Sequence, residues 1–220
     1  MATPSQAIVS RADRITMSEL KEENMYPADI HPESGCRLPP PERDQLDAET
    51  QKIYDVHMKP GGHSIRGLRG PGGIQLHSPE LSKTRRPLGR YLRFEAGFPD
   101  RVREVAILIT ARCCDCQFEW AAHEHEAQKA GVPELTIEAI KHNRSLDGLD
   151  ADDALIITLG RQIFRARKVT SETYAQCQKL FGNRALVDLV ALMGNYASTA
   201  ALLTAFDMQL DPGVEPPLPV

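Results

Sequence analysis

The feature that most constrains the fold is a run over residues 101–130 with apolar side chains at helical spacing. The apolar positions recur every three or four residues, as on one face of a helix, at Val102, Val105, Ala106, Leu108 and Ile109. A single helix of this length is long for a globular protein. Residues 112–115 are poor helix formers, and Asp115 is suited to cap a new helix. We therefore expect a break or kink near 113–115 and a helix end at Gly131.

The rest of the chain also predicts helices. Ser78 before Pro79 is typical of a helix start, and Asp150 and Thr170 are suited to cap two later helices. The helices expected outside the central run cover residues 47–57, 78–95, 134–142, 151–166, 171–181 and 184–206. Aromatic residues make up only 5% of the chain, so the core must consist of Leu, Ile, Val and Ala. No long segment alternates with the period of a strand, and the predicted fold class is all-α.

The domain organisation follows from length and from Pro and Gly content. A length of 220 residues suits one domain with an additional arm. We expect an N-terminal arm with a short helix over 1–60, a helical domain over 61–210 and an extended, Pro-rich tail over 211–220. The connection over 60–73 is so rich in glycine that we expect no regular element there. It is either a solvated surface loop or a loop that completes a site.

The net charge and the N-terminal residues limit the kinds of partner that the protein is expected to bind. A formal net charge of -4 argues against a nucleic-acid partner, because proteins that bind nucleic acids are usually basic. The first twenty residues contain no apolar run long enough for a signal peptide, and no stretch approaches the ~18 apolar residues that span a bilayer. We therefore expect a cytoplasmic protein with a small-molecule substrate and neither a membrane nor a nucleic-acid partner.

The five cysteines, at positions 36, 113, 114, 116 and 177, do not form the even set of a secreted disulfide framework. Three interpretations of the Cys113-x-x-Cys116 pair stay open: buried free thiols, a redox dithiol, and half of a zinc site. A structural zinc site normally has a second ligand pair across a loop, and the sequence offers none. We expect no metal.

A group of residues that suits acid–base chemistry begins at Cys116. On a helix, Cys116, Glu119 and His123 lie within about 60° of one another, and Arg112 joins them if the helix continues back. A carboxylate and an imidazole four residues apart are close enough to hydrogen-bond, and such a pair can transfer protons. The alternative is a solvated pair on an exposed helix. Trp120 and its small apolar neighbours favour a packed face with polar groups directed into a cavity.

Two strings of residues here match a known signature. One is Arg103-Glu104-Val105-Ala106-Ile107-Leu108, and the other is Asp115-Cys116-Gln117-Phe118-Glu119-Trp120-Ala121-Ala122-His123, followed by Ala127 and Ala130-Gly131. They resemble the signature of the carboxymuconolactone decarboxylase-like, AhpD-like family, over about residues 65–207. The resemblance implies an all-helical bundle and a homo-oligomer, trimeric or hexameric, with sites near subunit contacts.

The resemblance implies two chemistries. One branch of the family decarboxylates a lactone without a metal or an organic cofactor. The other branch consists of thiol peroxidases that use a Cys-x-x-Cys pair with a Glu before it and a His after it. The matching positions here are Glu104, Cys116, Glu119 and His123, so a glutamate replaces the second cysteine. The Cys113/Cys116 pair lies one turn too early for the peroxidase pattern, and we therefore prefer the lyase and keep the peroxidase or disulfide reductase as the alternative.

For a lyase that acts on a carboxylated lactone or ring compound from aromatic breakdown, we assign roles as follows. His123 donates the proton and Glu119 orients it. Glu104 joins the catalytic group only if the chain turns near 113–115, because on a straight helix it would lie about 18 Å from Cys116. The residues expected to bind substrate are Arg112 or Arg69 on the carboxylate, His77 on the enolate oxygen, and Cys116 and Trp120 beside the pair.

Overall fold

A computed structural model of the chain describes residues 26–59 and 67–219. Within these residues the regular structure is helical and no β-strand occurs, apart from an isolated bridge between His31 and Cys36. The predicted all-α class is therefore confirmed. The start of the predicted arm, 1–25, and the first half of the glycine-rich connection, 60–66, lie outside the described residues.

The helices follow the predicted order closely. In chain order they are η2 (Arg43–Gln45), α2 (Ala48–Met58), α3 (Pro71–Leu76), α4 (Pro79–Arg90), η3 (Tyr91–Glu95), α5 (Asp100–Cys113), α6 (Gln117–Lys129), α7 (Glu134–Lys141), α8 (Ala151–Arg161), η4 (Gln162–Ala166) and α9 (Ser171–Ala205). The segments η3 and η4 are short stretches of wider π-helix that end α4 and α8. They lie inside the helices predicted over 78–95 and 151–166.

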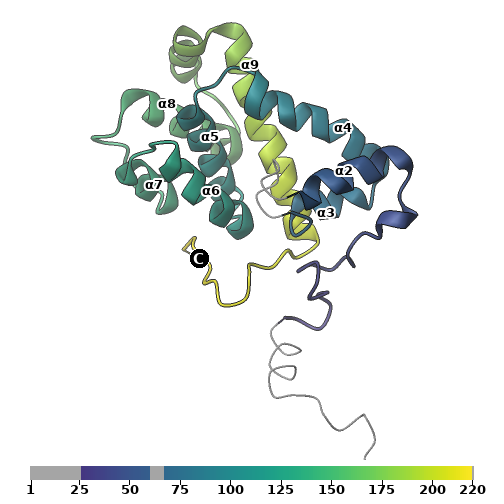
Figure 1. The fold of residues 1–220 in the computed structure, drawn as a ribbon. Coiled ribbons are helices and arrows are strands. Elements are labelled where there is room, and N and C mark those ends of the chain that lie inside the picture. The colour runs from purple at the N-terminus through teal and green to yellow at the C-terminus, as the bar shows by residue number, and fades with distance from the viewer. Residues whose placement is uncertain (1–25, 60–66, 220) are drawn as a thin grey trace, which may run out of the picture.

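The helices form two groups on either side of α9 (Figure 1). Helices α5 to α8 make up one group, and α2 to α4 make up the other. Helix α5 is the centre of the first group, since it packs against α6, α7, α8 and α9. Its five consecutive residues Val105 to Ile109 are fully buried, so this helix is covered on all sides. The Leu, Ile, Val and Ala content of the core agrees with the low aromatic content.

Local sequence explains where several helices begin. The side chains of Asp150 and Thr170 accept hydrogen bonds from backbone amides of the first turn, as predicted, and Asp47 caps α2 in the same way. Pro79 occupies the first turn of α4 as expected. Ser78 stands at the N-cap of α4, but its side chain makes no capping hydrogen bond, which differs from the expectation.

The expectation that the glycine-rich connection holds no regular element is wrong for its second half, where α3 forms. Pro71 stands in the first turn of this helix, where its missing amide hydrogen costs nothing. Gly72 and Gly73 follow because nothing larger fits. A Cβ on Gly72 would lie 2.7 Å from the ring of His57, and one on Gly73 would lie 2.0 Å from the carbonyl oxygen of Leu68. Glycine here allows close packing and does not prevent a helix.

Helix α9 contains a more apolar stretch than the sequence analysis allowed. Judged by length and composition alone, an 18-residue stretch of this helix could cross a membrane. In this structure 44% of that stretch is buried. That corrects the expectation that no stretch approaches such a length. Non-helical backbone at Gly182 (φ 71°, ψ 169°) divides the helix near the predicted boundary between 171–181 and 184–206. Packing on α5 and α8 accounts for its buried apolar face.

The arm and the tail both return to the helical body. The described part of the arm joins the end of α9 through a hydrogen bond from the Arg37 amide to the Phe206 carbonyl. In the tail, Leu218 is buried, and its amide and carbonyl pair with the side chain of Gln117 at 2.8 and 3.0 Å. Gln117 is the first residue of α6, so the tail is anchored beside that helix start.

Candidate functional site

A tight turn folds α6 back against α5 and so positions the candidate site. Helix α5 ends at Cys113, Asp115 takes a left-handed conformation (φ 49°), and the amide of Cys116 donates to the carbonyl of Ala111 at 2.9 Å. The break predicted near 113–115 is therefore confirmed. The N-cap of α6 is Cys116, however, and not Asp115 as expected. Asp115 forms the turn itself, because aspartate tolerates a positive φ better than most residues.

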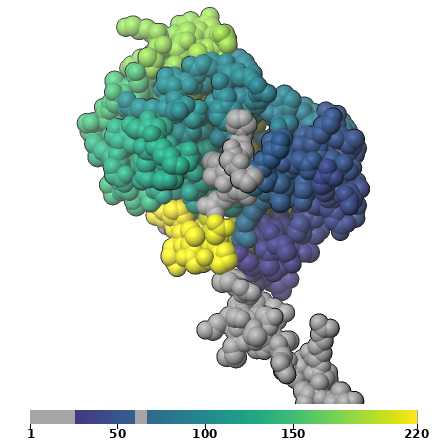
Figure 2. Space-filling view, in the orientation of Figure 1, coloured from purple at the N-terminus to yellow at the C-terminus, as the bar shows by residue number. Residues whose placement is uncertain are grey.

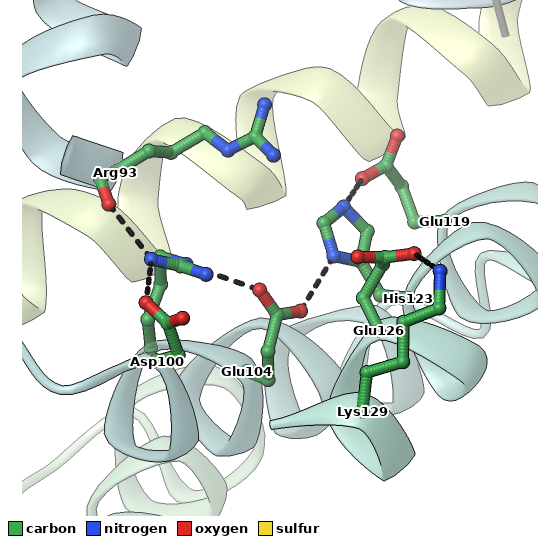
Figure 3. A network of polar contacts seen from close by, with 8 residues as sticks. Arg93, Asp100, Glu104, Glu119, His123, Glu126 and Lys129 are labelled. Atoms are coloured by element: carbon green, nitrogen blue, oxygen red, sulfur yellow. Dashed lines mark hydrogen bonds and ion pairs between the residues drawn. The ribbon is translucent and has the colours of Figure 1, made fainter. Parts of the chain in front are cut away.

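The turn brings Glu104, from the middle of α5, onto the imidazole of His123 on α6 (Figure 3). The distance from His123 Nδ1 to Glu104 Oε2 is 2.8 Å. The other ring nitrogen, Nε2, faces Oε2 of Glu119 at 3.7 Å, which is too long for a hydrogen bond. Both carboxylates and the imidazole are buried. The ring of Tyr196 on α9 meets the imidazole edge to face, with centroids 5.2 Å apart.

A chain of polar contacts supports Glu104 from the side opposite His123 (Figure 3). Arg103 Nε donates to Glu104 Oε1 at 3.0 Å. The same guanidinium donates through Nη1 to the Arg93 carbonyl and to Asp100 Oδ1. Both oxygens of Glu104 therefore accept hydrogen bonds, so the carboxylate is fixed on the Nδ1 side of the imidazole.

The two carboxylates have opposite pKa shifts. Burial tends to raise the pKa of Glu104, but the hydrogen bonds and charges of His123 and Arg103 outweigh it and lower the pKa. Burial raises the pKa of Glu119, only partly opposed by the charges of His123, Arg93 and Arg85. Glu104 is therefore the carboxylate that stays ionised, and it accepts a hydrogen bond from Nδ1–H. Glu119 is the one that retains its own proton more readily, next to Nε2.

Glu119 and His123 line a cavity of about 870 Å³ between the two groups of helices. Its walls come from five helices and one π-helical segment: α2, α3, α4, η3, α6 and α9. In Figure 2, α2 (blue) lies on one side of this face of the molecule and the α5–α8 group (teal to green) on the other. The volume falls in the range of small-molecule sites, which is about 300–1,000 Å³.

The cavity wall is basic although the chain as a whole is acidic. The basic side chains that line it are Lys52, Arg69, Lys83, Arg85, Arg86, Arg90 and Arg93, against two acidic side chains, Glu49 and Glu119. The net charge of the whole chain is -4. Concentrated positive charge in a concave site attracts anions, so the cavity favours a negatively charged ligand.

The structure places the expected substrate-binding residues in different surroundings. Arg69 lines the cavity, but its guanidinium also donates to Tyr26 Oη and the Leu210 carbonyl and pairs with Asp211. None of the other four, Arg112, Trp120, His77 and Cys116, lines the cavity. Arg112 donates to the Lys141 carbonyl and pairs with Asp115, Trp120 is fully buried in the main core, and exposed His77 contacts the Pro39 carbonyl at 2.9 Å.

The cysteines lie away from the cavity. Cys116 is buried in a small apolar cluster with Cys36, Ile74 and Phe118. Burial raises the pKa of its thiol to about 12. Burial also raises the pKa of Cys113, in spite of Arg165 nearby. All five cysteines are free thiols. Because the thiolate is the reactive form, these surroundings do not activate the Cys113/Cys116 pair.

Several cavity residues were not predicted from the sequence. Tyr196, Asn195 and Thr199 reach the site from α9, and Arg85 is held there by hydrogen bonds to Asn195 and Thr199. The only sequence signal for Arg85 and Arg93 is a basic stripe on the helix predicted over 78–95. Among the described residues, no group of three or more His, Cys, Asp or Glu side chains is arranged to hold a metal ion.

Together the fold and the site define an all-helical domain in which two helices joined by a tight turn, α5 and α6, bury a Glu–His–Glu group beside a basic cavity. Residues 79–158 match the model of the Carboxymuconolactone decarboxylase family. The resemblance seen in the sequence is therefore confirmed over this segment. The matched segment runs from α4 into α8 and contains Glu104, Glu119 and His123, whereas α2, α3 and α9 lie outside it. Searches of curated proteins and of solved structures found no match.

Proposed function

We propose that this protein is a cofactor-independent lyase that decarboxylates a small carboxylated lactone or ring compound by proton transfer at Glu119 and His123. The observation that carries the proposal is the buried imidazole between two carboxylates of opposite pKa shift, at the wall of a basic cavity. The match to the carboxymuconolactone decarboxylase family over 79–158 supports the reaction class.

In the proposed reaction, the bond between the ring carbon and the carboxylate breaks and carbon dioxide leaves. The electron pair stays on the substrate and is delocalised into a conjugated carbonyl as a dienolate. The dienolate then takes a proton at carbon. Glu119, whose pKa burial raises, and Nε2 of His123 are the groups placed to deliver that proton into the cavity. Glu104 accepts the hydrogen bond from Nδ1, so its role is to orient the imidazole and support its positive charge.

The substrate carboxylate needs a cationic partner. Arg93 and Arg85 line the cavity and lie near enough to Glu119 for their charges to oppose the rise of its pKa. We assign them to the substrate carboxylate, in place of the sequence-based assignment to Arg112. Tyr196, which packs on His123, closes the α9 side of the reacting end.

The thiol peroxidase alternative has less support. Neither Cys113 nor Cys116 lines the cavity, and burial raises the pKa of both thiols. A peroxidase would need one of them as a thiolate in contact with peroxide. The lyase needs neither cysteine, so the two functions differ in which residues they require.

The test is a screen of carboxylated unsaturated lactones in D₂O. It would follow carbon dioxide release and deuterium incorporation at the carbon that loses the carboxylate. We expect Glu119→Gln and His123→Gln to lower the rate by about 10²–10⁴-fold, the usual contribution of a general acid or base. Glu126→Gln, on the same helix but paired with Lys129 outside the cavity, is the matched control. Unchanged rates in both site variants, or no release from any lactone, would overturn the proposal.

A further inference from the structure

The end of the cavity formed by α2 and α4 has its own group of basic side chains. Lys83, Arg86 and Arg90 are spaced by three and four residues on α4, so they lie on one face of that helix. Lys52 comes from α2. Two of the four are neutralised: Lys83 pairs with Asp47 and Glu80, and Arg90 pairs with Glu95.

Lys52 and Arg86 have no such partner. Within residues 26–59 and 67–219, no carboxylate lies within ion-pair distance of either side chain, and both are exposed. Glu49 is the one acidic side chain of α2 that lines the cavity. Two unpaired cations beside a concave surface leave a net positive charge for a ligand to neutralise.

His57 adds a polar atom to the same cavity wall, near enough to Arg86 to feel its charge. Its ring lines the cavity and fits against Gly72, where a Cβ would lie 2.7 Å from the ring. The Nδ1 atom is buried and has no hydrogen-bond partner among the described residues. Burial, followed by the charge of Arg86, lowers the pKa of His57, so the ring is neutral at pH 7. A buried nitrogen without a partner is costly unless a ligand or water satisfies it.

The rest of the wall suits the body of an organic molecule. Ile53 and Val56 from α2, and Phe118 and Ala122 from α6, present apolar surface to the cavity. A volume of about 870 Å³ is far more than a single small ring needs, and it lies near the upper end of the range for ligand sites. Helix α2, which forms one side of the cavity wall, lies outside the segment 79–158 that matches the family model.

We propose that Lys52, Arg86 and His57 form an anion subsite that binds a second acidic group of an elongated substrate, remote from the reacting carbon. This inference rests on the proposed function, because it takes the reacting end to lie at Glu119 and His123. The second group is a carboxylate or a phosphate on an apolar stem. The α2 helix then determines the length and the terminal charge of the substrate.

The test measures binding of three probes with a ten-carbon chain by calorimetry: decanoate, decanedioate and 10-phosphonodecanoate. In the native protein we expect at least one of the two doubly acidic probes to bind about fivefold or more tightly than decanoate, and the tighter one identifies the second group. The double variant Lys52→Gln/Arg86→Gln should remove this preference. Lys168→Gln/Lys179→Gln removes two exposed lysines outside the cavity and should keep it.

Equal binding of all three probes, absence of binding, or a preference that survives the Lys52/Arg86 double variant would overturn the subsite. Binding needs no turnover, so the result is independent of the reaction. If the preference follows Lys52 and Arg86 but Glu119→Gln and His123→Gln keep full lyase activity, the subsite stands and the proposed function fails. If the lyase test succeeds and the preference is absent, only the subsite fails.

Discussion

Glu104 and Glu119 contact the same imidazole, yet the protein favours the charged form of one and the neutral form of the other. The difference lies in their other partners. Glu104 accepts hydrogen bonds from Arg103 and His123, whereas Glu119 has burial as its main influence and faces Nε2 at 3.7 Å. This difference allows one imidazole to be oriented by an anion on one side while a proton is available on the other.

Glu104→Gln should weaken folding in a pH-dependent way. Burial opposes ionisation of Glu104, but hydrogen bonds and charges from His123 and Arg103 lower its pKa below the ordinary value of 4.5. A lowered pKa means that the stabilisation is complete above 4.5 and is lost as the pH falls through the folded-state pKa. We expect the variant to lose roughly 2 kcal/mol at pH 7. Urea unfolding at pH 7 and at pH 4 should show a smaller difference at the lower pH, and a constant difference would contradict the assignment.

Glu119→Gln should show the opposite trend. Burial raises the pKa of Glu119 above 4.5, so its stabilisation is complete below that pH and is lost as the pH rises through the folded-state pKa. The native protein should therefore lose stability relative to Glu119→Gln as the pH increases from 4.5. Thermal unfolding across the pH range measures this, with Glu126→Gln, paired with Lys129 outside the cavity, as the control. If the native protein instead lost stability relative to Glu119→Gln as the pH fell, the raised pKa of Glu119 would be contradicted.

Some of the residue-scale arrangement could be predicted from the sequence. The pair Glu119 and His123 follows from helical spacing. Glu104 was expected from the family resemblance, on the condition of a turn near 113–115, and that turn brings α5 alongside α6. Which nitrogen each carboxylate meets could not be predicted, since it depends on the offset between two packed helices. The sequence assigned the orienting role to Glu119, whereas the 2.8 Å contact is made by Glu104.

At the scale of helices, close packing of α5 on α8 depends on Gly160. A Cβ there would lie 2.8 Å from Cγ1 of Ile109, whereas one on Gly194 of α9 would meet nothing within 4 Å. Gly160→Ala should lower the free energy of unfolding by about 1–3 kcal/mol through overpacking. Gly194→Ala should raise it by about 0.5–1 kcal/mol, because alanine favours a helix. Chemical unfolding of both variants measures this, and equal effects would contradict the packing of α5 on α8.

Helix boundaries were predicted well where capping residues mark them, as at Asp150 and Thr170. They were predicted less well where packing decides. In α3, positions 72 and 73 are glycines because His57 and Leu68 lie too close for a side chain. This closeness results from tertiary packing, so the local sequence did not predict the helix. The two helices predicted over 171–181 and 184–206 make up α9, and non-helical backbone at Gly182 separates them.

At the scale of the whole molecule, Arg69 connects the arm, the cavity wall and the tail. Its guanidinium contacts Tyr26 and Pro32 of the arm and Leu210 and Asp211 of the tail. Arg69→Gln should loosen both ends, so protease cleavage within 26–46 and 207–219 should become several-fold faster. Arg167→Gln, at the exposed arginine that directly follows η4, is the control. Cleavage at the native rate would mean that other contacts hold the arm and tail.

The cavity itself could not be predicted, because its walls come from α2, α4, α6 and α9, which lie far apart in the sequence. The basic character of the cavity could not be predicted either, because the chain as a whole is acidic. The sequence predicted that Glu119 and His123 lie on one helix, and the packing of the other helices forms the cavity beside them.

The most direct test of the account compares kcat/KM for carbon dioxide release in two variants, Cys113→Ser/Cys116→Ser and His123→Gln. With the proposed chemistry at the Glu–His–Glu group, the cysteine variant should retain activity within a few-fold of the native value. His123→Gln should lose about 10²–10⁴-fold. Loss of activity in the cysteine variant together with retention in His123→Gln would contradict the account and place the reaction at the thiols.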